Sequence, residues 1–265
     1  MNRLILLALV TASLNAKVYY SKIEPYEIRT ISSNVSAQVV FTDEKKLGKV
    51  LDNGDYIKLD DELDLVELKQ LKQKTTLLDD TIKLDEEIVK NYQDILEKKN
   101  INYDRIKVLK IKSTVEKDKE FYDLYTTQNQ YLSTKKELDS LKMQLLDTSL
   151  QIARLNKSVK DKHLSAKGYV LYDLMVKEGQ VVAMSTPLAK IADVSKAILT
   201  VYLDEEDVKG IENKKIFIDG KKTEYKIDRL WNITDETHIS SYKAEIIVKT
   251  PQRFSKLVQI EFKDE

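Results

Sequence analysis

Hydrophobic residues recur at alternating intervals of three and four through the middle of the chain, between residues 68 and 159. A first series consists of Leu68, Leu71, Thr75, Leu78, Ile82, Asp85, Val89, Tyr92, Leu96, Lys99, Tyr103 and Ile106. A second series consists of Leu124, Thr127, Tyr131, Thr134, Leu138, Leu141, Leu145, Thr148, Ile152, Leu155 and Val159. A mean spacing of 3.5 residues keeps a narrow stripe facing one partner helix. Each series therefore predicts a long helix packed in a coiled coil.

The phase of the repeat breaks between residues 110 and 113, and a helix-start motif follows the break. Ser113 and Glu116 have the spacing of a capping box, in which the two side chains bind each other's backbone amides. We therefore predict that one helix ends near Lys110 and the next begins near Thr114. The simplest arrangement is an antiparallel hairpin over residues 63–160, with arms of ~45 residues and a length of roughly 65–70 Å. A single long dimerising rod is the alternative.

Glycine and proline are confined to the two flanks of this helical region. None of the six glycines and three prolines lies between residues 55 and 167, whereas the flanks combine turn residues with short β-branched runs such as 181–182 and 244–248. In both flanks a glycine, Gly54 or Gly179, is followed three residues later by Ile57 or Val182 and nine residues later by Leu63 or Leu188. We expect these glycines to adopt positive φ in tight turns and the apolar residues to face a shared core. The flanks then form two halves of one β-sandwich.

The first sixteen residues have the pattern of a secretory signal peptide. Arg3 precedes the apolar run 4–10, and small and polar residues lead to Ala16. The apolar run is too short for a membrane-spanning helix, which needs ~20 residues. We therefore expect export, and a buried N-terminal strand or helix is the alternative.

The composition excludes several classes of function. The 44 basic and 44 acidic residues leave no net charge to hold a nucleic acid, and the absence of Cys excludes disulfides, thiolate metal sites and a cysteine nucleophile. His163 and His238 are isolated and lack metal-ligand spacing. No phosphate-binding loop or nucleophile motif is present. The acidic residues 60–62 are expected to complement the dipole of the first helix. We therefore predict a protein that is not an enzyme and binds no cofactor.

The chain resembles the HlyD-like periplasmic adaptor, or membrane fusion, proteins of tripartite efflux and type I secretion systems. The resemblance lies in residues 53–58, 168–170, 177–182, 186–193 and 199–208. It implies an α+β fold in the order strand region 17–32, lipoyl-like half 33–62, coiled-coil hairpin 63–160, lipoyl-like half 161–195 and β-barrel 196–265. In carrier enzymes such a domain presents a modified Lys at a tight turn. The hairpin would replace that turn, so carrier function is not expected.

The same resemblance implies a function and a set of partners. The protein would join an inner-membrane transporter of RND or ABC type to an outer-membrane channel, as a ring of several copies in the periplasm. The family's channel contact at the hairpin tip would correspond to Arg105 and Leu109, but Glu116 stands where the family has a Ser. A coiled-coil tether with β-rich binding heads is the alternative function.

Two further departures concern the flanks of the barrel. The glycine-rich final barrel strand of the family is missing, and residues 256–258 stand in its place. The family's membrane-proximal domain is expected to be absent or reduced to residues 17–29.

Overall fold

The computed structural model describes residues 17–234 and 240–264. The predicted signal peptide and His238 lie outside the described residues. The chain divides into two compact units. The hairpin unit contains residues 34–38 and 58–164, and the β unit contains the segments up to residue 33, 39–57 and from 165 onwards.

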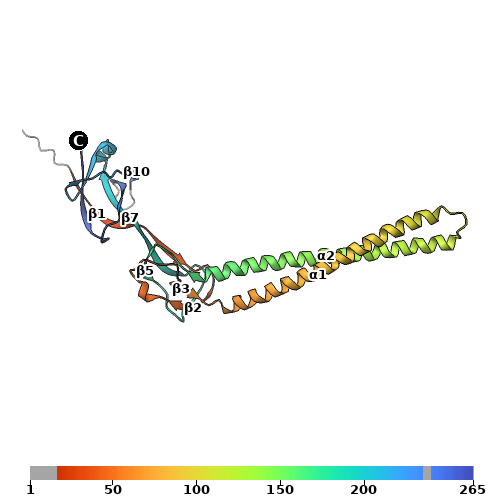
Figure 1. The fold of residues 1–265 in the computed structure, drawn as a ribbon. Coiled ribbons are helices and arrows are strands. Elements are labelled where there is room, and N and C mark those ends of the chain that lie inside the picture. Colours follow the sequence, from red (N-terminus) through yellow and green to blue (C-terminus); the bar gives the residue numbers. More distant parts are fainter. Residues whose placement is uncertain (1–16, 235–239, 265) are drawn as a thin grey trace, which may run out of the picture. The chain divides into compact units, whose positions relative to one another are not determined.

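Two antiparallel helices make up most of the hairpin unit (Figure 1), α1 (Glu62–Lys107) and α2 (Thr114–Asp161). Every position of the two predicted series is buried or half-buried, and on α1 the only other such residues are Asp64 and Asp79. The coiled-coil prediction is therefore confirmed. The single-rod alternative is wrong, because the chain reverses between residues 107 and 114.

The first helix ends three residues earlier than predicted, at Lys107. Its apolar series ends at Ile106, so another turn would have no seam residue to pack against α2. The backbone instead tightens, and the Leu109 amide donates to the Ile106 carbonyl at 3.1 Å. At the start of α2 the capping box is confirmed, because the Glu116 amide donates to Ser113 Oγ at 3.3 Å and the Ser113 amide to Glu116 Oε2 at 3.0 Å.

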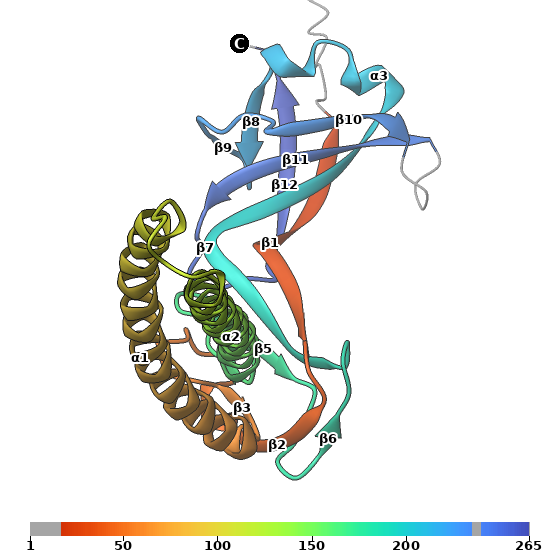
Figure 2. The same cartoon turned by 90° about the vertical axis from the view of Figure 1, so that its right-hand side faces the viewer.

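The β unit is built on one antiparallel sheet of eight strands (Figure 2). Seven of them follow the order β10 (Arg229–Thr234), β11 (Ser241–Lys249), β7 (Pro187–Asp204), β1 (Val18–Ser32), β12 (Leu257–Lys263), β8 (Lys215–Ile218) and β9 (Lys221–Lys222). The eighth, β5 (Val170–Leu174), pairs with β7. Short helices η1 (Glu44–Lys46), α3 (Glu205–Val208) and η2 (Ile211–Asn213) complete the unit.

The long strands β1 and β7 each pair with more than one other strand along their length. Residues 18–22 of β1 pair with β12, and residues 23–32 pair with β7. The stretch 17–29, which we considered as the remnant of a further domain, therefore belongs largely to a strand of the main sheet.

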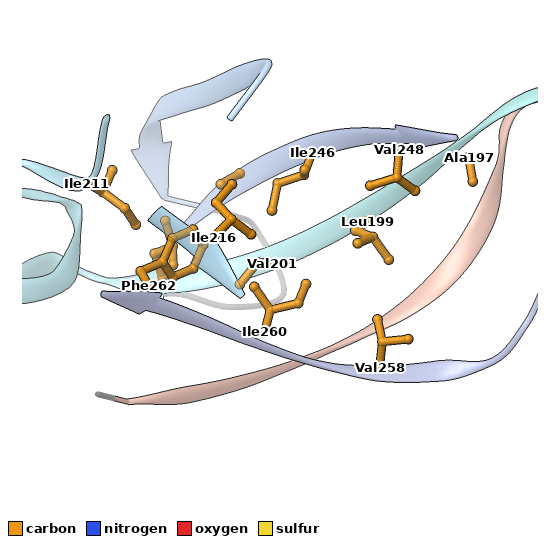
Figure 3. Close-up of a cluster of buried hydrophobic side chains, with 12 residues drawn as sticks. Ala197, Leu199, Val201, Ile211, Ile216, Ile246, Val248, Val258, Ile260 and Phe262 are labelled. Carbon is orange, nitrogen blue, oxygen red and sulfur yellow. The ribbon is translucent and has the colours of Figure 1, made fainter. Parts of the chain in front are cut away.

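Alternation of apolar and polar residues builds the core beside this sheet (Figure 3). Along each strand, every second side chain points inward. The inward side chains form a cluster of Ala197, Leu199, Val201, Leu203, Ile211, Ile216, Ala244, Ile246, Val248, Val258, Ile260 and Phe262. Strand β12 supplies the last three of them, so it packs as a regular strand without the glycines of the family pattern.

Backbone hydrogen bonds inside the β unit join the two flanks of the hairpin. The Gly48 amide donates to the Leu171 carbonyl at 2.8 Å, and the Leu51 amide donates to the Tyr169 carbonyl at 2.7 Å. Strand β2 (Ala37–Thr42) likewise meets the turn before β6 (Val181–Val182), where the Gly179 amide donates to the Val39 carbonyl at 2.8 Å. Segments more than a hundred residues apart thus complete one β domain, as predicted.

Backbone hydrogen bonds within the hairpin unit join the start of α1 to the end of α2. Strand β3 (Ile57–Leu59) meets the segment before β4 (His163–Leu164) through the Leu59 amide and the Lys162 carbonyl, 2.8 Å apart. The Asp60 amide donates to the Gln38 carbonyl, also at 2.8 Å. These bonds hold the two helix ends together at the hairpin root.

Two details of the predicted glycine repeat are wrong. Ile57, Val182 and Leu188 are buried as expected, but Leu63 lies on α1 and is 81% exposed. Gly179 has φ of 84°, whereas Gly54 is not among the residues with positive φ. The Gly54 amide instead donates to Asp52 Oδ1 at 2.8 Å, and a Cβ there would come within 3.1 Å of that oxygen. Gly54 is thus favoured by a close approach, not by a left-handed backbone.

Candidate partner-binding site at the hairpin tip

The tip of the hairpin exposes aliphatic side chains that the coiled-coil seam does not use. Val108, Ile111 and Val115 are 71%, 89% and 77% exposed. Isolated exposed apolar residues are common on protein surfaces, but adjacent ones at the end of an element often mark a contact site. Of the four basic residues within 105–115, Lys107 and Lys112 pair with Asp104 and Glu116, whereas Arg105 and Lys110 form no ion pair among the described residues. The tip therefore combines apolar surface with positive charge.

The two residues expected to contact a channel both lie at this tip. Arg105 is exposed on the last turn of α1, and its guanidinium makes no hydrogen bond or ion pair within the part of the chain that the structure describes. Leu109 is 40% exposed and lies in the loop after α1, because that helix ends at Lys107. The structure thus brings the two residues to one end of the hairpin, where both face solvent.

The third position of the expected contact has a structural role. Lys112 Nζ donates to Glu116 Oε1 at 2.9 Å, and the Ser113 amide and hydroxyl both donate to Oε2 at 3.0 Å. These bonds, that of Lys112 first, lower the pKa of Glu116 to about 2. Both carboxylate oxygens are therefore engaged in capping α2. Glu116, which the resemblance aligns with a Ser, orders the loop by capping α2.

An aromatic cluster supports the helix ends beneath the tip. The ring of Phe121 lies 4.4 Å from that of Tyr125, 5.8 Å from that of Tyr103 and 5.7 Å from that of Tyr122, measured between centroids. One turn further on, Lys99 Nζ contacts Asp123 Oδ2 at 2.7 Å and Thr127 Oγ1 at 2.9 Å. Lys99 interrupts the apolar series, and these polar partners on α2 explain how the seam accepts it.

Sequence reasoning missed Val108, Ile111 and Val115 as candidate contact residues. All three lie outside the two apolar series, between the last seam residue of α1 and the first of α2. Apolar residues at a predicted helix–helix turn, where polar ones are usual, are the feature that could have identified them.

The hairpin root holds a group of paired charges. Asp61 is only 5% exposed and binds Lys58 at 3.3 Å and His163 Nε2 at 2.9 Å. Burial raises the pKa of Asp61, but the bonds from His163 and Lys58 outweigh it and hold that pKa below its usual value. Close by, Asp64 Oδ2 accepts from Lys162 at 2.9 Å and from Ser158 at 2.8 Å.

The acidic residues 60–62 lie at the start of α1 as expected, with Asp61 at its N-cap position. Asp61 is in addition a buried ion-pair partner. His163 Nε2 contacts Asp61 Oδ2 at 2.9 Å. Over residues 17–234 and 240–264 no group of three His, Cys, Asp or Glu side chains is arranged to hold a metal ion. Within the same residues, no helix has the length and apolar character needed to cross a bilayer.

Comparison with known proteins identifies the fold of this chain through solved structures. No protein-family model and no curated protein matches the chain. Among solved structures, MacA from Actinobacillus actinomycetemcomitans is 18% identical with a TM-score of 0.67, over 93% of this chain and 78% of that one. The membrane fusion protein Spr0693 from Streptococcus pneumoniae R6 is 9% identical with a TM-score of 0.64, over 94% of this chain and 100% of that one. A MacA–MexA chimera, with the α-hairpin domain of Pseudomonas aeruginosa MexA, is 18% identical with a TM-score of 0.55, over 94% of this chain and 82% of that one.

These similarities establish the fold. The chain has the membrane fusion protein fold, in which a helical hairpin is inserted into a β domain followed by further strands. The resemblance read from the sequence is therefore confirmed at the level of fold.

Proposed function

We propose that the protein is a non-enzymatic periplasmic adaptor of a tripartite export system. It would join an inner-membrane transporter, of RND or ABC type, to an outer-membrane channel for efflux or secretion. The observation that carries the proposal is the antiparallel hairpin itself, which returns to the β domain it interrupts and presents an apolar, basic tip at its far end. Such a hairpin places a contact surface at the end opposite its own root.

The tip would form the contact with the channel. Burial of Val108, Leu109 and Ile111 against a partner removes apolar surface from water, at roughly 25 cal/mol per Å². Arg105 is not engaged by the described residues, so it is available to pair with a carboxylate or backbone carbonyl of the channel. The expected partner surface is therefore apolar with an acidic margin.

The β unit would bind the transporter, and several copies would assemble side by side into a ring that seals a conduit. In this scheme the transporter supplies the energy, from ATP or a proton gradient. The adaptor contributes binding surfaces and the coupling between transporter motion and channel opening.

Site-specific photocrosslinking in whole cells tests the proposal. A photoreactive residue at Leu109 or at Ile111 should capture an outer-membrane channel, and the same residue at Lys69, an exposed site near the hairpin root, should not. Arg105→Ala should lower the yield from Ile111 several-fold, because one charge-assisted contact is lost. Capture of cell-wall or other envelope components without a channel, from both tip sites, would instead support the tether function and overturn the adaptor role.

A further inference from the structure

One part of the sheet in the β unit turns a mixture of apolar side chains and lysines outward. It consists of the first residues of β1 together with β12, β8 and β9, which are neighbours in this order (Figure 2). Because side chains alternate between the two faces of a sheet, the buried residues mark the inward face. They are Ser21, Ile216, Val258, Ile260 and Phe262. The residues between them form the outward face, which we call the lysine-rich face: Val18, Tyr20, Lys22, Lys215, Phe217, Lys222, Leu257, Gln259, Glu261 and Lys263.

The apolar members of the lysine-rich face are accessible to a partner. Tyr20 is 64% exposed and Leu257 is 62% exposed. Leu257 pairs with Lys22 in the register of β1 and β12, so it lies one diagonal step from Tyr20 on the same face. Single exposed apolar residues are ordinary on a protein surface, whereas neighbouring large ones indicate a contact site.

The lysine-rich face also carries a surplus of positive charge. Residues 214–222, which include β8 and β9, contain four lysines and one acidic residue. With the side chains that they contact, this segment and the face hold seven lysines and three carboxylates. Each carboxylate already contacts a lysine: Asp219 with Lys256 at 2.7 Å, Glu261 with Lys263 at 2.5 Å, and Glu24 with Lys22 at 4.0 Å. The remaining charge is positive and suits an anionic partner.

Neither protection of a sheet edge nor a protein interface accounts for this pattern. Lysines on an edge strand such as β9 prevent pairing with another sheet, but exposed Tyr20 and Leu257 would promote such association. The core of a protein interface is depleted of lysine, whereas here lysines alternate with the apolar residues. At a bilayer surface both kinds of residue find partners. Lysines reach the anionic headgroups, and tyrosines lie between the headgroups and the acyl chains.

We propose that the lysine-rich face binds a bilayer surface that contains anionic phospholipids. Val18, Tyr20 and Leu257 enter the headgroup layer, and the lysines contact the lipid phosphates. Only seven residues separate Val18 from the apolar run 4–10 of the predicted signal peptide, so the chain reaches this face directly after a segment that export brings to a membrane. The contact goes beyond the adaptor role, because it requires neither a transporter nor a channel.

Cosedimentation of the purified full-length protein with lipid vesicles tests the proposal. Binding to phosphatidylcholine vesicles with about 30% phosphatidylglycerol should exceed binding to phosphatidylcholine alone at least tenfold, and should weaken as the salt concentration rises. Lys22→Gln with Lys222→Gln should reduce binding to the anionic vesicles about tenfold, and Tyr20→Ala should reduce it several-fold. The apolar run 4–10 is present in every variant, so its own affinity for lipid cancels in these ratios.

A charge-matched variant serves as the control for the vesicle experiment. Lys69→Gln with Lys72→Gln removes the same charge from exposed sites on α1, and its binding should equal that of the natural protein. The same loss in both double variants, or no loss in Lys22→Gln with Lys222→Gln, would overturn the proposal. Since no transporter or channel is present, the result does not depend on the proposed adaptor function.

Photocrosslinking in whole cells distinguishes a lipid from a protein on the same face. A photoreactive residue at Leu257 should form phospholipid adducts, which intact mass spectrometry of the purified protein detects. The same residue at Lys69 should not form them. Capture of an acidic protein from Leu257, without lipid adducts, would make this face a protein interface and refute the lipid contact. Failure of the tip to capture a channel would refute the adaptor role and leave this result standing.

Discussion

The hairpin and the β unit bury their apolar residues in different ways. In the hairpin seam the buried apolar residues are Leu68, Ile82, Leu124 and Leu138; the threonines Thr127 and Thr148 are also buried, and the other seam residues are half-buried. In the β unit twelve residues from several strands and a short helix converge on one cluster. A seam between two helices offers each side chain a partner on one side only, whereas a cluster surrounds it.

This difference has consequences for what each region tolerates. A side chain removed from the cluster leaves a cavity that several strands border, and close-packed interiors relax only partly around such a cavity. A side chain removed from the seam leaves a gap open to water, and its effect is confined to neighbouring turns. Truncations in the seam should therefore cost less stability than truncations in the cluster.

Leu199→Ala should produce the largest loss of stability. Leu199 is 1% exposed in the middle of β7, and its truncation in a closed core should cost about 3–5 kcal/mol. Urea unfolding followed by the fluorescence of Trp231 measures this, because the only Trp of the chain lies in β10. Ile233→Ala in the same strand is the control, since an exposed side chain should change the stability by about 0.5 kcal/mol or less. Equal losses from both variants would contradict the cluster as the centre of the unit.

Ile82→Ala should have a smaller effect, and in the other unit. Ile82 is 7% exposed in the seam, and its loss should cost about 2 kcal/mol, the lower end of the range for such truncations, because the gap opens to solvent. The helical signal at 222 nm in thermal or urea unfolding reports the hairpin, while Trp231 fluorescence should remain unchanged. Leu63→Ala, at an exposed site on the same helix, serves as the control. A parallel shift of both signals in Ile82→Ala would show that the two regions unfold as one.

Periodicity predicted the hairpin well because the two series carry one repeated physical requirement. Each helix needs an apolar residue every three or four positions, and Leu68 through Ile106 satisfy this with polar exceptions such as Lys99 that find partners on α2. The capping box at Ser113 and Glu116 is likewise local, so four residues suffice to define it.

Features that depend on distant segments were less predictable. Leu63 was assigned to the β core because its spacing from Gly54 matched that of Leu188 from Gly179, but α1 begins at Glu62 and carries Leu63 outward. Burial of Asp61 depends on His163, a hundred residues away. The exposure of Ile111 follows from the exact end of α1, and helix ends are set by tertiary contacts more than by propensity.

The substitution Ser113→Ala and a lowered pH should have the smallest effects, and both effects should be confined to the hairpin tip. Loss of the cap should reduce the protection of the amides of residues 114–117 from hydrogen exchange by about 1 kcal/mol, with Ser140→Ala in the middle of α2 as control.

Because the pKa of Glu116 is lowered from 4.5 to about 2, its contribution is fully present above pH 4.5 and is lost as the pH falls towards 2. Protection factors at residues 114–117 should therefore decline over this range in the natural protein and be nearly constant in Glu116→Gln. The same decline in both proteins would show that another group governs the tip.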